Sequence, residues 1–491
     1  MSERWSFLRA EMPSWCMKSW VIAGNQRYLW NRGWFTTDFI MRYKIIFVLI
    51  WCFITSSEGF GQGSSGQNFI SSPYSNYGLG DWTQTNQYNA FGAHSTFSGL
   101  YSYSMMNPAT LGNVRFTTLD VASNLRSGTT TSGSEKQEFL GGNFEYLSLA
   151  LPVWKYLKRK QIGFDTARNV KRWKYTPFGA STAITLRPLT TKGYSYFLDN
   201  QQVLPTRTSY TGSGGVSQLM WNTGFRFSDH FMLGYGTGFL FGNTSEKALF
   251  SIPDSLELGL VEDSRTLVFR GMQQQVGALI QFKIDTTYHK IGGYYEWYGD
   301  VNAIQNRLTR TMAYNVSFTS PLDTIINEVG VNRGLTLPPA FGFGYTLRIR
   351  NDLQLSADYR RQLWSKYDAF FDSKKDYQDR EDYNFNLIIN PLDYKLGNVK
   401  KMPMPIRLGY GLTHSHISLN GSRLEEQRYS VGVGIPMIRR YFDNSVITNM
   451  IHVNLQYMTR GAGLAYPKEQ FITLGIGLQL GDIWFAKRKY D

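Results

Sequence analysis

The chain has 491 residues, a formal net charge of +14 at pH 7, 15% aromatic residues and 47 glycines. Its mean hydropathy is −0.31, and after residue 54 it contains no apolar run long enough to cross a bilayer as a helix, which excludes helical spans from that part of the chain. An aromatic excess without overall hydrophobicity is typical of the interfacial girdles of a transmembrane β-barrel.

The N-terminal region has the pattern of a signal peptide. Residues 45–54 (IIFVLIWCFI) are apolar but too short to span a membrane, and Arg42 and Lys44 precede them. We expect residues 41–61 to be a cleaved signal peptide and residues 1–40 to be an upstream extension from a misassigned start. The alternative is a genuine cytoplasmic segment before a signal anchor.

Cysteine content and charge fit an exported protein. Cys16 and Cys52 precede the predicted cleavage site, so the mature chain is expected to contain no disulfide and no thiolate metal site. Residues 1–61 hold seven basic and four acidic residues, which leaves 44 basic and 33 acidic residues and a net charge of +11. In an exported barrel we expect this charge to meet anionic lipid and lipopolysaccharide headgroups, and not nucleic acid.

Residues 62–114 are rich in Ser, Gly, Asn and Tyr and lack sustained alternation, so we expect them to lie outside the barrel wall. Near their end are Asn107, Pro108 and Ala109. Asn can bond its own backbone and Pro fixes φ, which favours a rigid turn where this segment leads into the wall. A structural role is the simpler interpretation of this turn, and a part in gating is the alternative.

From residue 115 to 491 the chain predicts an all-β fold, an antiparallel transmembrane barrel of about fourteen strands. In residues 471–480 (FITLGIGLQL) apolar side chains alternate with Thr, Gly and Gln, and this pattern recurs along the chain. An apolar face toward lipid and a Gly-rich or polar face toward a lumen is the barrel pattern. The expected strands are 115–131, 136–152, 177–188, 206–227, 230–248, 265–284, 289–312, 333–350, 353–366, 381–395, 403–414, 424–436, 447–460 and 469–481. The last is expected to close the barrel against the first, with Gly475 and Gly477 facing inward.

The connections predict an orientation, because bacterial barrels have short periplasmic turns and longer outer loops. The short polar turns are 228–230, 285–289 and 350–352, and the long segments are 249–264, 313–332 and 367–381. One periplasmic connection is exceptional, since residues 155–174 carry eight basic side chains against the single acid Asp165. A solvated basic loop is one interpretation, and a docking site for an anionic periplasmic partner is the other.

Several segments carry a resemblance to a known family. They are SPYSNYGLG at 72–80, AFGA at 90–93, MMNPATL at 105–111 and GDIWFAKRKY at 481–490. With them the chain resembles the FadL-type outer-membrane transporters of long-chain fatty acids and other hydrophobic compounds. The resemblance implies the outer membrane of a Gram-negative bacterium, a hatch inside the barrel at 62–114, and passive inward passage of a hydrophobic or amphipathic small molecule. The basic C-terminal tail departs from the usual terminal aromatic residue.

Alternation also predicts which charged side chains face the lumen. Glu296, Arg348, Asp358 and Arg360 face inward on three consecutive strands, with Arg407 nearby. One interpretation is a structural ladder of opposite charges that anchors the hatch. In the other, Arg348, Arg360 or Arg407 holds the carboxylate of an amphipathic substrate, and the inner glycines leave space for its acyl chain.

An enzyme is not expected. Catalysis would need a nucleophile with a base, or paired acids in a cleft, and no such spacing is evident. His and Met do not cluster as metal ligands, and the glycine runs alternate with large apolar residues, unlike a phosphate-binding loop. The sequence therefore predicts no catalytic residue, metal or cofactor. An interaction or secretion-associated barrel of the same family, without a transported substrate, remains the alternative function.

Overall fold

The computed structural model describes residues 72–482 with gaps at 84–86, 88–90, 166–169, 201–205, 252–259, 316–317, 350–352, 373–376, 390–392, 395–401, 420, 441–445 and 462–466. The expected upstream extension (1–40), the signal peptide (41–61) and the tail after residue 482 lie outside the described residues. Among those residues, no helix is both long and apolar enough to span a membrane.

The structure is nearly all β. The strands are β1 (Asp81–Trp82), β2 (Thr117–Ser132), β3 (Glu135–Asp165), β4 (Val170–Asn200), β5 (Thr206–Arg226), β6 (Phe231–Ser251), β7 (Leu260–Ile284), β8 (Thr287–Tyr298), β9 (Val301–Asn315), β10 (Phe318–Leu335), β11 (Ala340–Ile349), β12 (Leu353–Gln362), β13 (Arg380–Ile389), β14 (Asp393–Tyr394), β15 (Met402–Pro403), β16 (Ile406–Leu419), β17 (Ser422–Arg440), β18 (Val446–Arg460) and β19 (Lys468–Asp482). Short 3-10 helices are η1 (Pro73–Asn76), η2 (Pro108–Asn113) and η3 (Trp364–Lys366).

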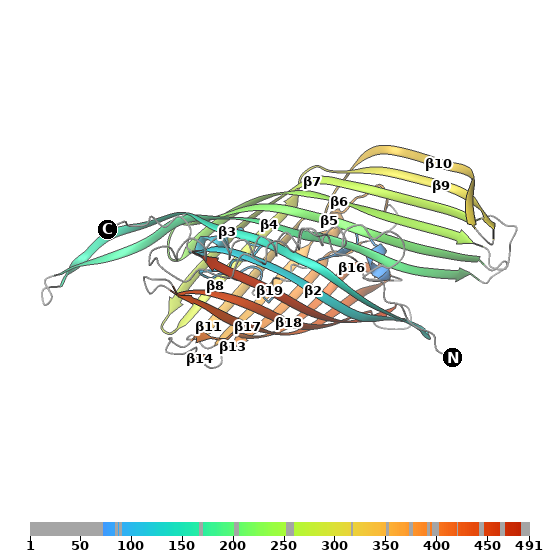
Figure 1. Cartoon of the computed structure of the whole chain (residues 1–491). Coiled ribbons are helices and arrows are strands. Elements are labelled where there is room, and N and C mark those ends of the chain that lie inside the picture. Colours follow the sequence, from blue (N-terminus) through green and yellow to red (C-terminus); the bar gives the residue numbers. More distant parts are fainter. Residues whose placement is uncertain are drawn as a thin grey trace, which may run out of the picture. The chain divides into compact units, whose positions relative to one another are not determined.

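The wall is a closed antiparallel barrel (Figure 1). β7 pairs with β8 along one half and with β9 along the other, so β8 and β9 are two parts of one wall strand, as are β10 and β11. The described residues thereby form fourteen wall strands, and β19 closes the barrel against β2 in the register that pairs Gly475 with Asn124 and Gly477 with Ala122. The predicted fold and closing strand are confirmed.

Three predicted loops are wrong. β6 continues to Ser251 and β7 begins at Leu260, while β9 and β10 form a paired hairpin through most of 313–332. The predicted basic loop at 155–174 is likewise largely strand, because β3 and β4 stay paired to Asp165 and Val170. These hairpins extend the wall beyond its shared height (Figure 1). Alternation of polar with apolar residues fades there, since both faces are away from lipid, so the sequence pattern no longer marks a strand.

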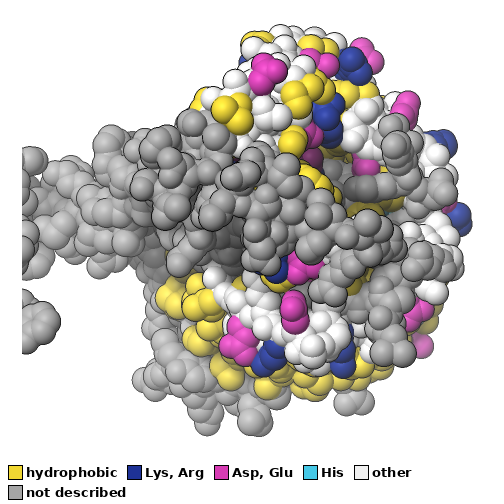
Figure 2. All heavy atoms as spheres, turned by 90° about the vertical axis from the view of Figure 1, so that its right-hand side faces the viewer, with side chains coloured by type: hydrophobic (Ala, Val, Ile, Leu, Met, Phe, Trp, Pro, Cys, Tyr) yellow, Lys and Arg dark blue, Asp and Glu magenta, His cyan; other side chains and the backbone are white. Residues whose placement is uncertain are grey.

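The barrel has two distinct ends. At the turn end, β5 and β6 are joined by residues 227–230 and β7 and β8 by 285–286, as predicted. At the loop end, the segment 363–379 joins β12 to β13 and the β6–β7 and β9–β10 hairpins project. Figure 2, viewed onto the loop end, shows acidic and basic side chains interspersed around the rim.

The outer face of the wall carries an apolar belt. On β19, Ile472, Leu474 and Ile476 are 54%, 39% and 51% exposed, whereas the inward residues between them are buried. Exposed Phe, Tyr and Leu side chains continue this belt around the other wall strands. So much exposed apolar surface fits a wall that meets lipid.

The N-terminal segment, residues 72–116, lies inside the barrel. It contributes η1, β1 and η2, and most of its described side chains are buried. η2 contacts β4, β5, β6 and β7, and η1 contacts β4. The segment therefore occupies much of the lumen between the two ends.

Candidate functional site

The wall splits between β3 and β4. The two strands are paired from the Asp165–Val170 pair to the Leu147–Leu186 pair. Beyond that point they separate. The rest of β3 (135–146) pairs only with β2, and the rest of β4 (187–200) pairs with β5. Exposed apolar side chains such as Leu140 flank the split, which places part of it within the belt. Backbone groups left unpaired at such a depth are costly, so the edge of β4 needs another partner.

The N-terminal segment supplies that partner. β1 pairs with β4 through Asp81 with Thr191 and Trp82 with Thr190. On either side of β1, the amide of Thr83 donates to the carbonyl of Leu189 at 3.0 Å, and the amide of Ser72 donates to the carbonyl of Gly193 at 2.9 Å. The segment thus acts as a short strand on the free edge of β4, directly at the split.

A cavity of about 350 Å³ lies behind the split. It is lined by the β3 residues Asn143 to Glu145, by Leu186 to Pro188 of β4 and by the β1 residues. Phe241, which is exposed on the outer face of β6, also lines it, so the cavity reaches the outside of the wall. Its charged lining comprises Asp81, Glu145, Glu426, Arg126, Arg187, Arg380, Arg428 and Arg460, and the buried His416 lies beside them.

Buried ion pairs cross the lumen from wall to wall. The chain of contacts runs from Glu296 through Arg360, Asp382, Arg380, Glu426 and Arg460 to Asp81 and Glu469. Arg460 of β18 is its centre, with Asp81 at 3.0 Å, Glu426 at 3.6 Å and a short contact to Glu469. Burial, together with the nearby Arg360 and Arg428 cations, lowers the pKa of His94 to about 3, so this ring adds no charge to the network.

The structure separates the charged residues that the sequence grouped together. Glu296 and Arg360 form a buried pair, and Arg360 also lies 3.5 Å from Asp382. Asp358 instead accepts a hydrogen bond from the amide of Ser95 at 2.7 Å. Arg348 faces Gln354 and Tyr288, near the turn end and six residues along β11 from the level of Arg360, so it is not part of this cluster.

Arg407 is buried and lies apart from the ion-pair network. Its guanidinium meets the Nδ1 atom of His452 at 3.2 Å, and it forms no ion pair among the described residues. Neither Arg348, Arg360 nor Arg407 lines the cavity of about 350 Å³. The arginines that the cavity presents are therefore different from those expected from alternation.

The Asn107 turn docks the end of the N-terminal segment onto the wall. Asn107 caps η2, because its Oδ1 atom accepts a hydrogen bond from the amide of Ala109 at 3.0 Å. Its Nδ2 atom donates to the carbonyl of Ser95 at 2.6 Å and to that of Ala278 on β7 at 3.1 Å. Asn107 thus connects two parts of the segment to each other and to the wall, and Pro108 begins η2 with the φ that a helix start requires.

Inward-facing glycines of the wall lie where the N-terminal segment packs closely against it. A Cβ at Gly234 would lie 2.2 Å from the carbonyl carbon of Pro108, and one at Gly277 would lie 2.0 Å from Oδ1 of Asn107. At Gly432 the nearest neighbour is the ring of Phe91, at 2.9 Å. At these positions the N-terminal segment, and not an acyl chain, occupies the space that the inner glycines leave.

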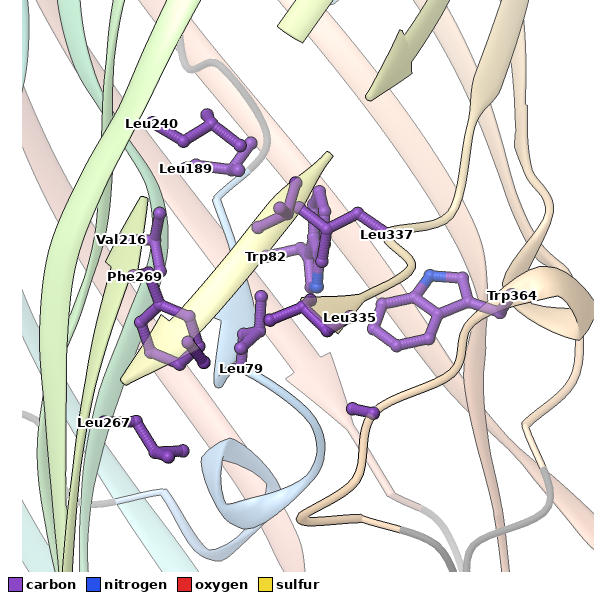
Figure 3. Close-up of a cluster of buried hydrophobic side chains, with 13 residues drawn as sticks. Leu79, Trp82, Leu189, Val216, Leu240, Leu267, Phe269, Leu335, Leu337 and Trp364 are labelled. Carbon is purple, nitrogen blue, oxygen red and sulfur yellow. The ribbon is translucent and has the colours of Figure 1, made fainter. Parts of the chain in front are cut away.

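An apolar cluster closes the lumen toward the loop end. Leu79 and Trp82 of the N-terminal segment meet Leu335, Leu337 and Trp364 from the other side, and inner-face residues of β4 to β9 complete the cluster (Figure 3). The Trp82 and Trp364 rings pack edge to face at 5.5 Å between centroids. Among the described residues, this cluster therefore obstructs the lumen toward the loop end.

Comparison with known proteins identifies the family. A family model described as BamG matches residues 41–164 and 175–491, far more than half of the chain. The chain belongs to the BamG family. No curated protein matches its sequence.

Solved structures resemble the BamG-family chain in fold. A FadL homologue from Pseudomonas aeruginosa is 11% identical over 81% of this chain and 98% of its own, with a TM-score of 0.50. The CymD monoaromatic hydrocarbon channel is 13% identical over 83% and 99%, with a TM-score of 0.46. The Pseudomonas putida toluene transporter TodX is 12% identical over 80% and 97%, with a TM-score of 0.43. The likeness to the FadL type is one of fold, at these low identities.

Several residues of the BamG-family site could not be predicted from the sequence pattern. Trp82 lies in the N-terminal segment, which lacks alternation, and Trp364 lies near the end of the expected strand 353–366, where the structure has η3 in place of a strand. Arg460 ends β18, and its partner Asp81 lies 379 positions earlier in the chain. Neighbouring strands could be paired from the sequence, but contacts between the N-terminal segment and the wall depend on how that segment folds inside the lumen.

Replacing Gly234 with Ala in this BamG-family chain is expected to displace the N-terminal segment. The new Cβ would meet backbone atoms of Pro108 and Ala109 at 2.2 and 2.3 Å, which cannot be relieved by a side-chain rotation. Overpacking of this kind costs ~1–3 kcal/mol. Limited proteolysis of the folded barrel should then cleave the segment faster than in the parent protein.

Gly334→Ala is the matched control for that experiment, because its Cβ would come no closer than 3.9 Å to another residue. Equal protection of the segment in Gly234→Ala and in the parent would contradict the packing described here.

Proposed function

We propose that this chain is an exported outer-membrane barrel of a Gram-negative bacterium that passes hydrophobic or amphipathic small molecules, such as long-chain fatty acids, inward without an energy source. The observation that carries the proposal is the cavity behind the β3–β4 split, inside a lumen that the N-terminal segment largely occupies. A molecule with an apolar part can reach this cavity beside the lipid-facing wall, whereas the apolar cluster obstructs free passage of ions.

The FadL-type fold supports this proposal, since the similar structures are described as hydrocarbon channels and a toluene transporter. Of the three arginines proposed to meet a carboxylate, Arg348 and Arg407 form no ion pair among the described residues, whereas Arg360 is held by Glu296 and Asp382. Asn107, Pro108 and Ala109 would hold the hatch against the wall. Lipid and lipopolysaccharide would surround the belt.

The test is uptake of a labelled long-chain fatty acid by cells that produce the protein, paired with single-channel recording of the purified barrel in a planar bilayer. We expect saturable uptake together with very low ion conductance. Conductance like that of an open pore, with uptake at the background level, would refute the proposal.

A second candidate function is an interaction barrel, and the β9–β10 hairpin favours it. β10 is shifted in register at three places, and Leu322, Ile325 and Val329 lie at these bulges with exposed fractions of 65%, 59% and 76%. The hairpin extends past the apolar belt, so these side chains face water. The basic 155–174 hairpin at the other end would suit an anionic periplasmic partner. Replacing the three apolar residues with Ser should leave uptake intact if the protein is a transporter, and should release co-purifying proteins if it is an interaction barrel.

A further inference from the structure

The cavity behind the split is polar and carries more positive than negative side chains. Its lining contains five arginines and three acids. An apolar tunnel would not need this lining, because charged groups near an apolar ligand lose hydration without compensation. The question is which of these charges already have partners in the protein.

All three acids are engaged. Glu426 lies between Arg380 at 3.9 Å and Arg460 at 3.6 Å, and Asp81 lies 3.0 Å from Arg460. Glu145 accepts a short hydrogen bond from Asn124. Arg380 and Arg460 are thus neutralised by neighbouring carboxylates.

Arg126 and Arg428 are not neutralised in this way. Neither forms an ion pair with any acid in the described part of the chain, and the Nε atom of each lacks a hydrogen-bond partner there. Arg428 donates only to the neutral oxygens of Asn384 at 3.3 Å and Thr413 at 3.2 Å. The Arg126 guanidinium lies 5.5 Å from the centre of the Phe471 ring. Arg126 and Arg428 therefore face the cavity outside any ion pair of the described residues, as does Arg187, which donates to the Sδ atom of Met106 at 3.2 Å.

His416 adds an independent observation. It lines the same cavity, is only 3% exposed, and neither ring nitrogen has a hydrogen-bond partner among the described residues. Its ring stacks on Trp364, with centroids 3.7 Å apart, which holds its orientation. A buried imidazole carries at least one N–H that requires an acceptor, and leaving it unpaired is costly.

We propose that this cavity is a binding site for the carboxylate group of a small amphiphile, held by Arg126, Arg428 and an N–H of His416. Two guanidinium groups and a neutral N–H donor suit the oxygens of an anion, and the planar fork of Arg matches a carboxylate. The inference rests on the proposed function, because it names the headgroup that the passing molecule carries.

The location and size of the site define the rest of the ligand. A cavity of about 350 Å³ accommodates a carboxylate with a short chain, and the split beside it leads to the lipid-facing surface of Phe241 and Leu140. The headgroup would therefore remain on the arginines while the chain extends toward the apolar belt. Such a site discriminates between an acid and an uncharged molecule of the same length.

The experiment compares octanoate with 1-octanol by calorimetric titration of the purified full-length barrel in lipid nanodiscs. We expect octanoate to bind about 10- to 100-fold more tightly, as charge-assisted hydrogen bonds imply. The double variant Arg126→Gln and Arg428→Gln should lose this preference. Arg428→Lys retains the charge and should keep most of it. The control Arg361→Gln removes an arginine that pairs with Asp379 outside the cavity and should have no effect.

A second readout uses acetate and acetamide, which carry the headgroup without the chain. Acetate should raise the melting temperature of the parent barrel more than acetamide, and should not do so in the double variant. If octanoate and octanol both fail to bind while acetate stabilises the parent selectively, the proposed transport function fails and the anion site stands. Equal binding of octanoate and octanol, a preference that survives the double substitution, or equal effects of acetate and acetamide would each overturn the site.

Discussion

With Thr96 and Thr346 both replaced by cysteine and oxidised to a disulfide, uptake of the labelled fatty acid is expected to fall to the background level and to recover after reduction. The Oγ1 atoms of these two buried threonines lie 2.7 Å apart, one on the N-terminal segment and one on β11. A disulfide there would tie the segment to the wall. Because the segment occupies much of the lumen, we expect inward passage to require it to shift, and the bond would prevent the shift.

The matched control for this cross-link is Thr182→Cys with Thr223→Cys. These Oγ1 atoms are 3.3 Å apart, and they join two neighbouring wall strands, β4 and β5. The remaining cysteines of the chain, Cys16 and Cys52, precede the expected cleavage site, so neither should interfere. Unchanged uptake with the oxidised Thr96 pair would mean that the substrate leaves through the split without any movement of the segment near β11.

Replacing Arg460 with Ala is expected to give the largest loss of stability of any single substitution in the lumen. Arg460 is 5% exposed and contacts Asp81, Glu426 and Glu469. Its removal leaves the buried carboxylates of Glu426 and Glu469, and the partly exposed one of Asp81, without their shared counter-charge. Breaking a buried pair of this kind costs about 3–5 kcal/mol. Unfolding of the reconstituted barrel in urea, followed by tryptophan fluorescence, measures the change.

Arg361→Ala serves as the comparison for that measurement. Arg361 pairs with Asp379 at 2.9 Å, but its side chain is 41% exposed, so the substitution should cost no more than ~1 kcal/mol. A similar effect of both substitutions would show that the lumen around Arg460 is well hydrated. Adding Glu469→Gln to Arg460→Ala should recover part of the loss, since one unpaired carboxylate is then neutral.

The wall could be predicted from the sequence because lipid imposes a strict rule on it. Every second residue of the belt must be apolar, and this alone located strands as far apart as β2 and β19 and paired them. This alternation is required only in the part of the wall that contacts lipid. The β9–β10 hairpin and the extension of β3 and β4 were therefore predicted as loops, although their backbones pair in the structure.

The interior was harder to predict for a related reason. Alternation predicted that Glu296, Asp358 and Arg360 face inward, as they do in the structure. It contained no information on their position along the barrel axis or on which residues of the N-terminal segment lie beside them. Asp358 thus bonds to Ser95 of that segment and not to an arginine of the wall. Arg126 and Arg428 lie at equally inward positions, yet only the split and the cavity distinguish them from other lumen charges.

The contacts of Asp81 also bear on the order in which the molecule assembles. Asp81 is near the beginning of the described chain, and Arg460, which holds it, is on the penultimate strand. β19 then completes the seam with β2 around a segment that already occupies the lumen. A segment enclosed in this way must be in place before β19 pairs with β2. The N-terminal segment would therefore serve as an internal template on which the hairpin of β18 and β19 docks.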